Sequence, residues 1–431
     1  MYELGIENGY VYLGKSFRKV NVYVNQGKID TLSVQKLPCE RAVDAEGKYV
    51  LPGFIDPHVH FALGVGKNVS KDDFHTGSVE AACGGVTTYI DFLDPVKTGE
   101  QIHTEFRKRK DLAKNSLVDY AFHTTIANPT DTPESIFENS LVEGINSVKL
   151  FTTYADTDRR TYDGYIYELL KESKKKGGIV VVHAENDELI EKRKNIPVRE
   201  HAKSRPVLSE NIEVMKLAQM ARAVDGHLYI VHVSAGSSVA LLKHNFEEEL
   251  KSHQIILESC PHYFLLNEDC LAGEDGYKYT MTPPIRPEKD RRMLVEYADW
   301  ISTIGTDHCP YTKEQKQHDA TSEIPMGIGG IRYSFLNMYQ LYGFEILPKF
   351  TKGPAVAYGL KNKGEILPGM DADIVIFDKN SVTQVKDDMS VYDGKTLKGK
   401  IETVLLRGNL ILDQEKIFRH TGQYVFRDGL Q

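Results

Sequence analysis

The stretch Asp56-Pro57-His58-Val59-His60, which follows the apolar run Tyr49-Val50-Leu51-Pro52-Gly53-Phe54-Ile55, decides how the rest of the chain is interpreted. On a β-strand successive side chains alternate between faces, so His58 and His60 are expected to point to the same side. Two imidazoles on one side can bind one metal ion together. The stretch therefore predicts a metal site at a strand end, although about 0.5 His-x-His pairs are expected by chance in a chain with this histidine content.

Four later apolar runs also end on residues suited to a metal site, namely Lys149, His183, His232 and Asp307. In a parallel barrel the carboxyl ends of all strands open on one face, so these residues are expected to converge there with the first two histidines. A single histidine at a strand end is more often hydrogen-bonded to backbone than bound to metal. Five such strand ends in one chain favour a common site.

Apolar strands and amphipathic helices alternate from about residue 51 to residue 355. The strand candidates are 51–58, 86–92, 118–124, 145–151, 179–183, 228–232, 255–259 and 301–306. Eight strands in β/α alternation over this length predict a (β/α)₈ barrel of the α/β class. A doubly wound open sheet is the alternative, and it is disfavoured because the predicted ligands lie on the first, middle and last strands.

Both ends of the chain carry short alternating β patterns, at 9–13 and 20–24 and again at 373–377 and 401–406. A small β-sandwich built from both termini would pair the strand edges of each piece with the other. We therefore expect the N-terminal part of the sandwich over 1–50, the barrel over 51–355, and the C-terminal part of the sandwich with a tail over 356–431.

Composition narrows the possible partners. The chain of 431 residues has 41% hydrophobic and 26% charged residues, with a net charge of −8. The sequence has no basic block, which argues against nucleic acid or an anionic membrane as a partner. Its five cysteines form no C-x-x-C pair, so no disulfide framework or thiolate zinc site is predicted. The N-terminus lacks a signal-peptide pattern and no apolar run reaches membrane-spanning length, so a cytoplasmic enzyme with a small-molecule substrate is expected.

Imidazoles with one carboxylate suit zinc or another late divalent metal better than calcium. Such ions lower the pKa of bound water towards about 7, and Asp307 could both bind metal and accept the proton. Lys149 is unusual, because an ammonium beside two cations suffers desolvation and repulsion. Addition of CO₂ to its neutral amine would give a carbamate that bridges two metals. The alternative is a strand shifted by one residue, with Lys149 pointing outward.

The chain resembles the amidohydrolase superfamily, in its cyclic-amidase branch, and most closely the dihydropyrimidinases and hydantoinases. The resemblance covers nearly the whole chain and rests on residues 51–60, Lys149 and the segments His183-Ala184-Glu185-Asn186, His232-Val233-Ser234, Thr306-Asp307-His308-Cys309-Pro310 and 363–373. It implies a barrel with a β-sandwich from both termini and a binuclear zinc site. His58, His60 and Asp307 would hold one ion, His183 and His232 the other, and carboxylated Lys149 with a hydroxide would bridge them.

The resemblance also assigns residues that contact the substrate. Tyr154 matches the tyrosine that hydrogen-bonds the substrate carbonyl and its developing oxyanion, and backbone groups at Thr282 and Met326 would hold the ring amide. These two positions are commonly Ser and Asn in the family, and a nearby Pro-Gly-Ile-Glu run reads Gly329-Gly330-Ile331-Arg332 here. The loop at 325–332 is therefore expected to differ from that of its relatives.

The resulting hypothesis is a metal-dependent hydrolase that opens the cyclic amide of a dihydropyrimidine or hydantoin through a metal-bridging hydroxide. Dihydroorotase and allantoinase are alternatives, and a non-catalytic assembly protein is a remote one. Dihydroorotases of the family carry an arginine two residues after the second histidine, where this chain has Ala62, so an uncharged ring is favoured unless Arg286 or Arg332 replaces that cation. The family also implies a homotetramer or homodimer.

Overall fold

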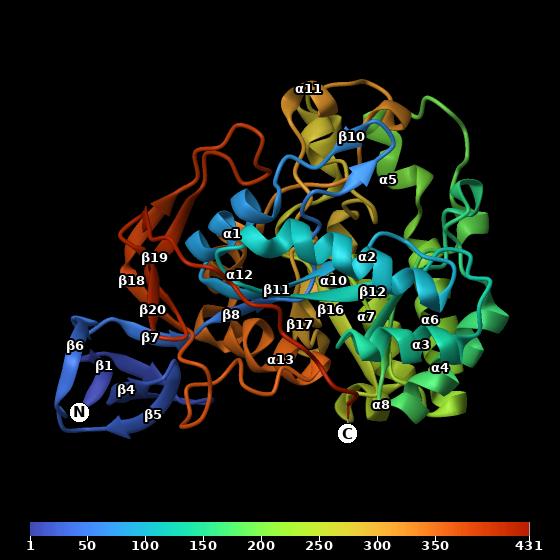
Figure 1. The fold of residues 1–431 in the computed structure, drawn as a ribbon. Helices are drawn as coiled ribbons and strands as arrows, with labels where there is room; N and C mark the ends of the chain where they lie inside the picture. Colours follow the sequence, from blue (N-terminus) through green and yellow to red (C-terminus); the bar gives the residue numbers. More distant parts are fainter. Residues whose placement is uncertain (431) are drawn as a thin grey trace.

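The computed structural model describes residues 1–430, and its centre is a nearly closed barrel of parallel strands surrounded by helices (Figure 1). Neighbours along the chain are neighbours in the barrel. The barrel strands are β8 (Phe54–Asp56), β11 (Val86–Phe92), β12 (Asp119–Thr125), β13 (Ser147–Phe151), β14 (Ile179–His183), β15 (Leu228–Ile230), β16 (Ile255–Ser259) and β17 (Thr303–Ile304). The predicted (β/α)₈ barrel is confirmed, and the doubly wound alternative is wrong.

The barrel strands are buried on both faces, as expected for parallel strands that carry helices outside and side chains inside. Their covering helices follow them in sequence. They include α1 (Phe74–Cys83), α2 (Gly99–Leu112), α3 (Pro133–Val142), α4 (Asp163–Lys176), α6 (Val207–Val224), α7 (Gly236–Asn245), α10 (Glu288–Glu296), α12 (Ser334–Tyr342) and α13 (Lys352–Tyr358). Local signals set their ends: Asp73 forms a capping box at the start of α1, and Gly177 ends α4 with φ of 63°.

The barrel closes where its first and last strands, β8 and β17, meet. The hydroxyl of Thr306 donates to Asp56 Oδ2 at 2.6 Å, and the backbone N–H of His60 donates to the carbonyl of His308 at 2.9 Å. A single parallel bridge joins Val59 to His308. The closure therefore brings the His58–His60 segment directly beside Asp307.

The expected strand over 51–58 is in fact two strands in two different sheets. β7 (Tyr49–Pro52) belongs to the terminal sheet, and β8 begins after Gly53, where a Cβ would lie 2.2 Å from Thr87 Oγ1. β8 ends at Asp56 because Pro57 has no N–H to continue the ladder. His58 and His60 thus lie just beyond a strand end, and their common direction comes from barrel closure rather than from strand alternation.

The chain ends build two further sheets beside the barrel (Figure 1). One has the order β5-β4-β1-β6, from β1 (Tyr2–Glu7), β4 (Asn21–Asn25), β5 (Lys28–Ser33) and β6 (Cys39–Asp44). The other has the order β21-β20-β19-β18-β7-β2-β3, from β2 (Tyr10–Tyr12), β3 (Phe17–Lys19), β7, β18 (Ile374–Gln384), β19 (Thr396–Leu406), β20 (Asn409–Asp413) and β21 (Lys416–Ile417). Because β18 pairs antiparallel with β7, the expected β-domain shared by both termini is confirmed.

The C-terminal tail then returns to the barrel. The Val425 N–H donates to the carbonyl of Tyr120 at 2.7 Å, and the guanidinium of Arg427 is buried against the Phe122 carbonyl. Within residues 1–430, none of the helices has the length and apolar character needed to cross a lipid bilayer.

Candidate metal centre

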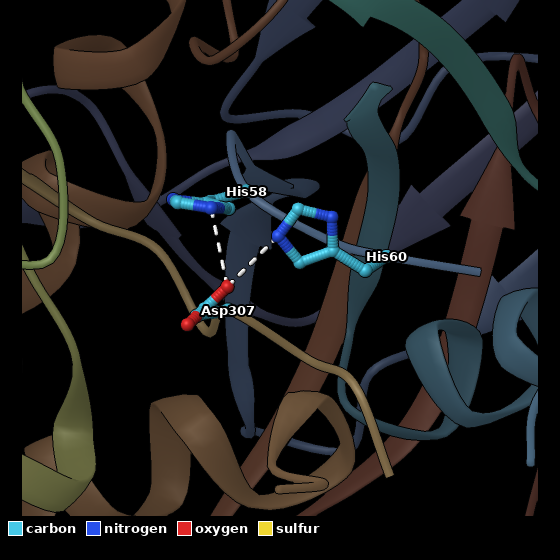
Figure 2. A group of neighbouring side chains, drawn as sticks. All are labelled: His58, His60 and Asp307. Atoms are coloured by element: carbon cyan, nitrogen blue, oxygen red, sulfur yellow. Dashed lines mark ion pairs between the residues drawn. The ribbon is translucent and has the colours of Figure 1, made fainter. Parts of the chain in front are cut away.

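Three of the predicted ligands meet at the junction of β8 and β17 (Figure 2). His58 Nε2 lies 3.2 Å from Asp307 Oδ1, and His60 Nε2 lies 3.0 Å from the same oxygen. One ligand atom from each residue fits within 4.8 Å of the others, which is the spacing of a metal site. His58 Nε2 is buried and forms no well-directed hydrogen bond among residues 1–430. The three side chains therefore form a possible metal site.

Glu258, on β16, contacts both histidine groups and orients the His58 ring. Its Oε1 lies 2.8 Å from His58 Nδ1 and accepts the backbone N–H of His232, and its Oε2 accepts the Tyr229 hydroxyl at 2.8 Å. Burial by itself lowers the pKa of His58, but Glu258 and Asp307 raise it to about 9. Burial would raise the pKa of Asp307, yet the two histidines hold it well below its usual range. Asp307 is therefore an ionised carboxylate.

His183 and His232 form a second pair beside the first cluster. His183 Nδ1 lies 3.0 Å from His232 Nε2, and the rings of His58 and His232 are 5.4 Å apart between centroids. The other nitrogen of His183 lies 2.7 Å from Glu185, and Arg205 binds that carboxylate at 2.6 Å. The two groups of histidines thus form one continuous cluster at the carboxyl ends of β8, β14 and β15.

Lys149 lies inside the barrel between the two groups. Its side chain is buried, with 2% exposure, and its ammonium lies 5.2 Å from the ring centre of Phe92 and 5.4 Å from that of Phe151. Phe92 packs on His58 and His60, whereas Phe151 packs on His183. Within residues 1–430 the ammonium forms no ion pair, and burial lowers its pKa to about 8. The structure therefore places Lys149 inward.

The predicted substrate-contact residues lie on one side of the cluster. The Tyr154 hydroxyl is 2.9 Å from Thr282 Oγ1, and the Tyr154 ring centre is 5.5 Å from that of His183. Tyr154 has φ of 69°, in the left-handed region, and burial raises its pKa. Met326 is half-buried in the loop that leads to Gly327, whose backbone lies against Cys309. Tyr154 therefore lies beside His183, and the residue after Met326 packs against Cys309, two residues from Asp307.

A second acidic group, Asp119, Asp371 and Asp373, also has metal-like spacing. It is already neutralised, because the Lys363 ammonium lies 2.7 Å from Asp119, 3.0 Å from Asp371 and 2.7 Å from Asp373. It links the start of β12 to the start of β18, so we interpret it as structural.

A cavity of about 600 Å³ is lined in part by His308, the residue next to Asp307. The nitrogen atoms of His308 are both engaged: Nε2 lies 2.9 Å from Asp72, and Nδ1 accepts the Gly330 N–H at 3.0 Å. The cavity is lined by Lys316 and Arg332 among others, and none of the predicted metal ligands lines it. It is therefore separate from the metal centre.

Three functional partners were missed in the sequence. Glu258, Glu185 and Arg205 orient the histidines, yet no role was assigned to them. Glu258 had a detectable signal, since it is the one charged residue in the apolar run 255–259. Glu185 lies in the His183–Asn186 segment that carries the resemblance, but nothing in the sequence indicates its pairing with Arg205, because only the fold brings the two residues together.

Comparison with known proteins agrees with this geometry. The model of the amidohydrolase family matches residues 49–411. A D-hydantoinase of Ralstonia pickettii is 31% identical over 445 residues, covering 95% of each chain. A D-phenylhydantoinase of Escherichia coli O81 (strain ED1a) is 31% identical over 439 residues, covering 94% of each. The crystal structure of dihydropyrimidinase from Brevibacillus agri NCHU1002 matches with a TM-score of 0.90 and 27% identity, covering 100% of both chains.

The chain belongs to the amidohydrolase family. Within that family it is a hydantoinase-like cyclic amidohydrolase, as its full-length similarity to hydantoinases and a dihydropyrimidinase indicates. The predicted family and enzyme class are confirmed.

Proposed function

We propose that this enzyme hydrolyses the ring amide of an uncharged dihydropyrimidine or 5-substituted hydantoin at a binuclear metal centre. The observation that carries the proposal is the contact between the His58–His60–Asp307 cluster and the His183–His232 pair, with Lys149 buried between them. The names of the relatives support the same ring class.

The side chains fit two divalent ions, most simply Zn²⁺. Four imidazoles and one carboxylate are the donors that zinc prefers, and no thiolate or second carboxylate is needed. Carboxylation of Lys149 would supply an anionic ligand and remove an unpaired buried charge: the ammonium first loses one proton, and addition of CO₂ to the neutral amine then gives the carbamate and releases a second proton. Bound ions would lower the pKa of water towards about 7 and polarise the ring carbonyl.

The residues of the chain then have distinct roles. Asp307, ionised and next to both histidines, accepts a proton from the attacking water and returns it to the leaving ring nitrogen. The Tyr154 hydroxyl, whose raised pKa keeps it protonated, donates to the oxygen that develops negative charge. Backbone groups of Thr282 and Met326 hold the ring amide.

The charges around the site favour a neutral substrate. Ala62 provides no cation, and the two candidate arginines, Arg286 and Arg332, are already paired, as is Arg205 beside His183. Arg286 donates to Ser234 at 2.7 Å and lies 3.3 Å from Glu210, Arg332 lies 3.1 Å from Glu80, and Arg205 is bound to Glu185. A substrate carboxylate would be buried without a partner, so dihydroorotate is expected to be disfavoured by roughly a hundredfold.

Two measurements test the proposal. Active protein prepared with excess metal should contain about two divalent ions per chain. His58→Ala should lose metal and activity, whereas His318→Ala, at an exposed position, should lose neither. A count of one ion or fewer in active protein would contradict the binuclear centre.

The substrate class is tested by comparing kcat/KM for dihydrouracil, hydantoin, dihydroorotate and allantoin. A neutral dihydropyrimidine or hydantoin should be preferred. A clear preference for dihydroorotate would show that the assignment of an uncharged ring is wrong. We also propose a homodimer or homotetramer, which sedimentation of the metal-loaded protein tests directly.

A further inference from the structure

One buried lysine outside the metal centre has no carboxylate partner. Lys316 is the last residue of α11 (Lys313–Lys316), and its side chain is 2% exposed. Its ammonium donates to the carbonyl of Thr280 at 2.8 Å and to the carbonyl of Gly327 at 2.6 Å. Among residues 1–430 it forms no ion pair. The ammonium is therefore held by its two hydrogen bonds to backbone carbonyls.

The two carbonyls belong to segments that border the metal centre from different sides. Thr280 lies two residues before Thr282, whose hydroxyl meets Tyr154 at 2.9 Å. Gly327 directly follows Met326, and with φ of 149° and Cys309 packed against it there is no room for a side chain. The next residue, Ile328, accepts the N–H of Cys309 at 2.8 Å. Lys316 thus connects the 280–282 segment to the 326–328 loop, which is hydrogen-bonded to the segment Asp307–Cys309.

Both segments have other anchors, but those anchors lie on different elements of the fold. His201 Nε2 lies 2.8 Å from the Met281 carbonyl, whereas the 327–330 loop is bound to His308 and Cys309. The direct link between them is one backbone bond, from the Gly327 N–H to the Thr280 carbonyl at 3.1 Å. The Lys316 ammonium bonds to the same Thr280 oxygen and to the neighbouring Gly327 oxygen, so it fixes the spacing that this single bond leaves adjustable.

Burying the Lys316 ammonium costs free energy, which indicates that its hydrogen bonds have a specific role. A buried ammonium without a counterion loses its hydration, and this burial lowers the pKa of Lys316 to about 7. A methionine of similar length would fill the space without that cost. Charge-assisted bonds to two carbonyls replace the lost hydration only while both segments stay in place.

We propose that Lys316 is a positioning residue that sets the distance between the backbone groups of Thr282 and Met326, and so determines how well the enzyme holds a cyclic amide. The inference rests on the proposed function, because it assigns to these two backbones the ring amide as their ligand. It adds a residue that touches neither substrate nor metal and acts through the two segments it joins.

The test compares Lys316→Met with Lys313→Met, an exposed position on the same short helix. In Lys316→Met, KM for hydantoin or dihydrouracil should rise by at least about tenfold, because a small displacement of binding groups is costly, while metal content stays unchanged. Hydrogen–deuterium exchange should be faster by about tenfold in peptides covering 280–283 and 325–330. Lys313→Met should change neither quantity.

The outcomes separate this inference from the proposed function. A wild-type enzyme that hydrolyses none of the tested rings refutes the proposed function. An active wild type with unchanged KM in Lys316→Met refutes the positioning role, and so does a loss confined to thermal stability or to the active fraction. A rise in KM together with faster exchange in both segments supports it.

Discussion

Two buried lysines, one inside the barrel and one at its junction with the C-terminal sheet, carry the same charge in opposite surroundings. Lys363 lies at the junction with the C-terminal sheet and meets three carboxylates within 3.0 Å, which raise its pKa despite burial. Lys149 lies at the metal centre, meets no carboxylate at ion-pair distance among residues 1–430, and has its pKa lowered to about 8 by burial. Burial of a charge therefore does not by itself mark the metal centre. What distinguishes Lys149 is that its unpaired ammonium lies among converging histidines.

The same contrast separates the two acidic clusters. The Asp119–Asp371–Asp373 group is neutralised by Lys363, by Arg407 and, at Asp371, by Lys28 at 2.6 Å, so it binds two parts of the fold together. Asp307 faces two imidazoles whose nitrogens are well placed for a cation between them. The first cluster has a complete set of partners, which indicates a stabilising role, whereas the arrangement around Asp307 fits a bound cation.

The largest expected effect comes from breaking the metal-centre lysine. Lys149→Ala and Lys149→Arg should each lower kcat/KM by about a thousandfold or more, since loss of even one transition-state contact costs a hundred- to a thousandfold and a guanidinium cannot form a carbamate. The folded state should persist, because the change removes an unpaired buried charge in one case and keeps it in the other. Steady-state kinetics with circular dichroism measures both.

A matched design tests the carbamate itself. A small carboxylate such as acetate or propionate should restore part of the activity of Lys149→Ala, which leaves space for it, but not of Lys149→Arg. Carbon-13 NMR of wild-type protein with labelled bicarbonate should show the carbamate signal. Unmodified Lys149 in protein with two bound metals would contradict the assignment.

The junction lysine should show the opposite result. Lys363→Met leaves three carboxylates short of one cation, and breaking a buried ion pair in this way should lower the free energy of unfolding by about 3–5 kcal/mol. Activity per folded molecule should stay unchanged. Urea unfolding measures the loss, and Lys361→Met, which removes an exposed pair with Asp428, serves as the control. A fall in kcat/KM of folded Lys363→Met would break the distinction between the two lysines.

The sequence predicts the barrel because its strand and helix periods are local properties. The same holds for the site residues that end apolar runs, such as His183. It does not predict that Pro57 ends β8 and moves His58 and His60 beyond the strand, since their orientation depends on a bridge to His308. Nor does it reveal Lys316, whose role arises from two backbone carbonyls that only the folded chain brings to it.

The smallest expected effect concerns the pH dependence of stability at Lys316, a third buried lysine that resembles Lys149 in lacking a carboxylate. Its pKa is about 7 in the folded state and about 10.4 in an unfolded chain, so between these values the unfolded state binds more protons. Wild-type stability should therefore gain up to about 1.4 kcal/mol per pH unit from this group as pH rises from 7 towards 10. Lys316→Met should lack that gain, whereas Lys313→Met should keep it. Urea unfolding of the three proteins at pH 7, 8 and 9 measures the difference. If the free energy of unfolding of wild type and of Lys316→Met changed with pH in parallel, Lys316 would stay charged in the folded state and the expectation would be wrong.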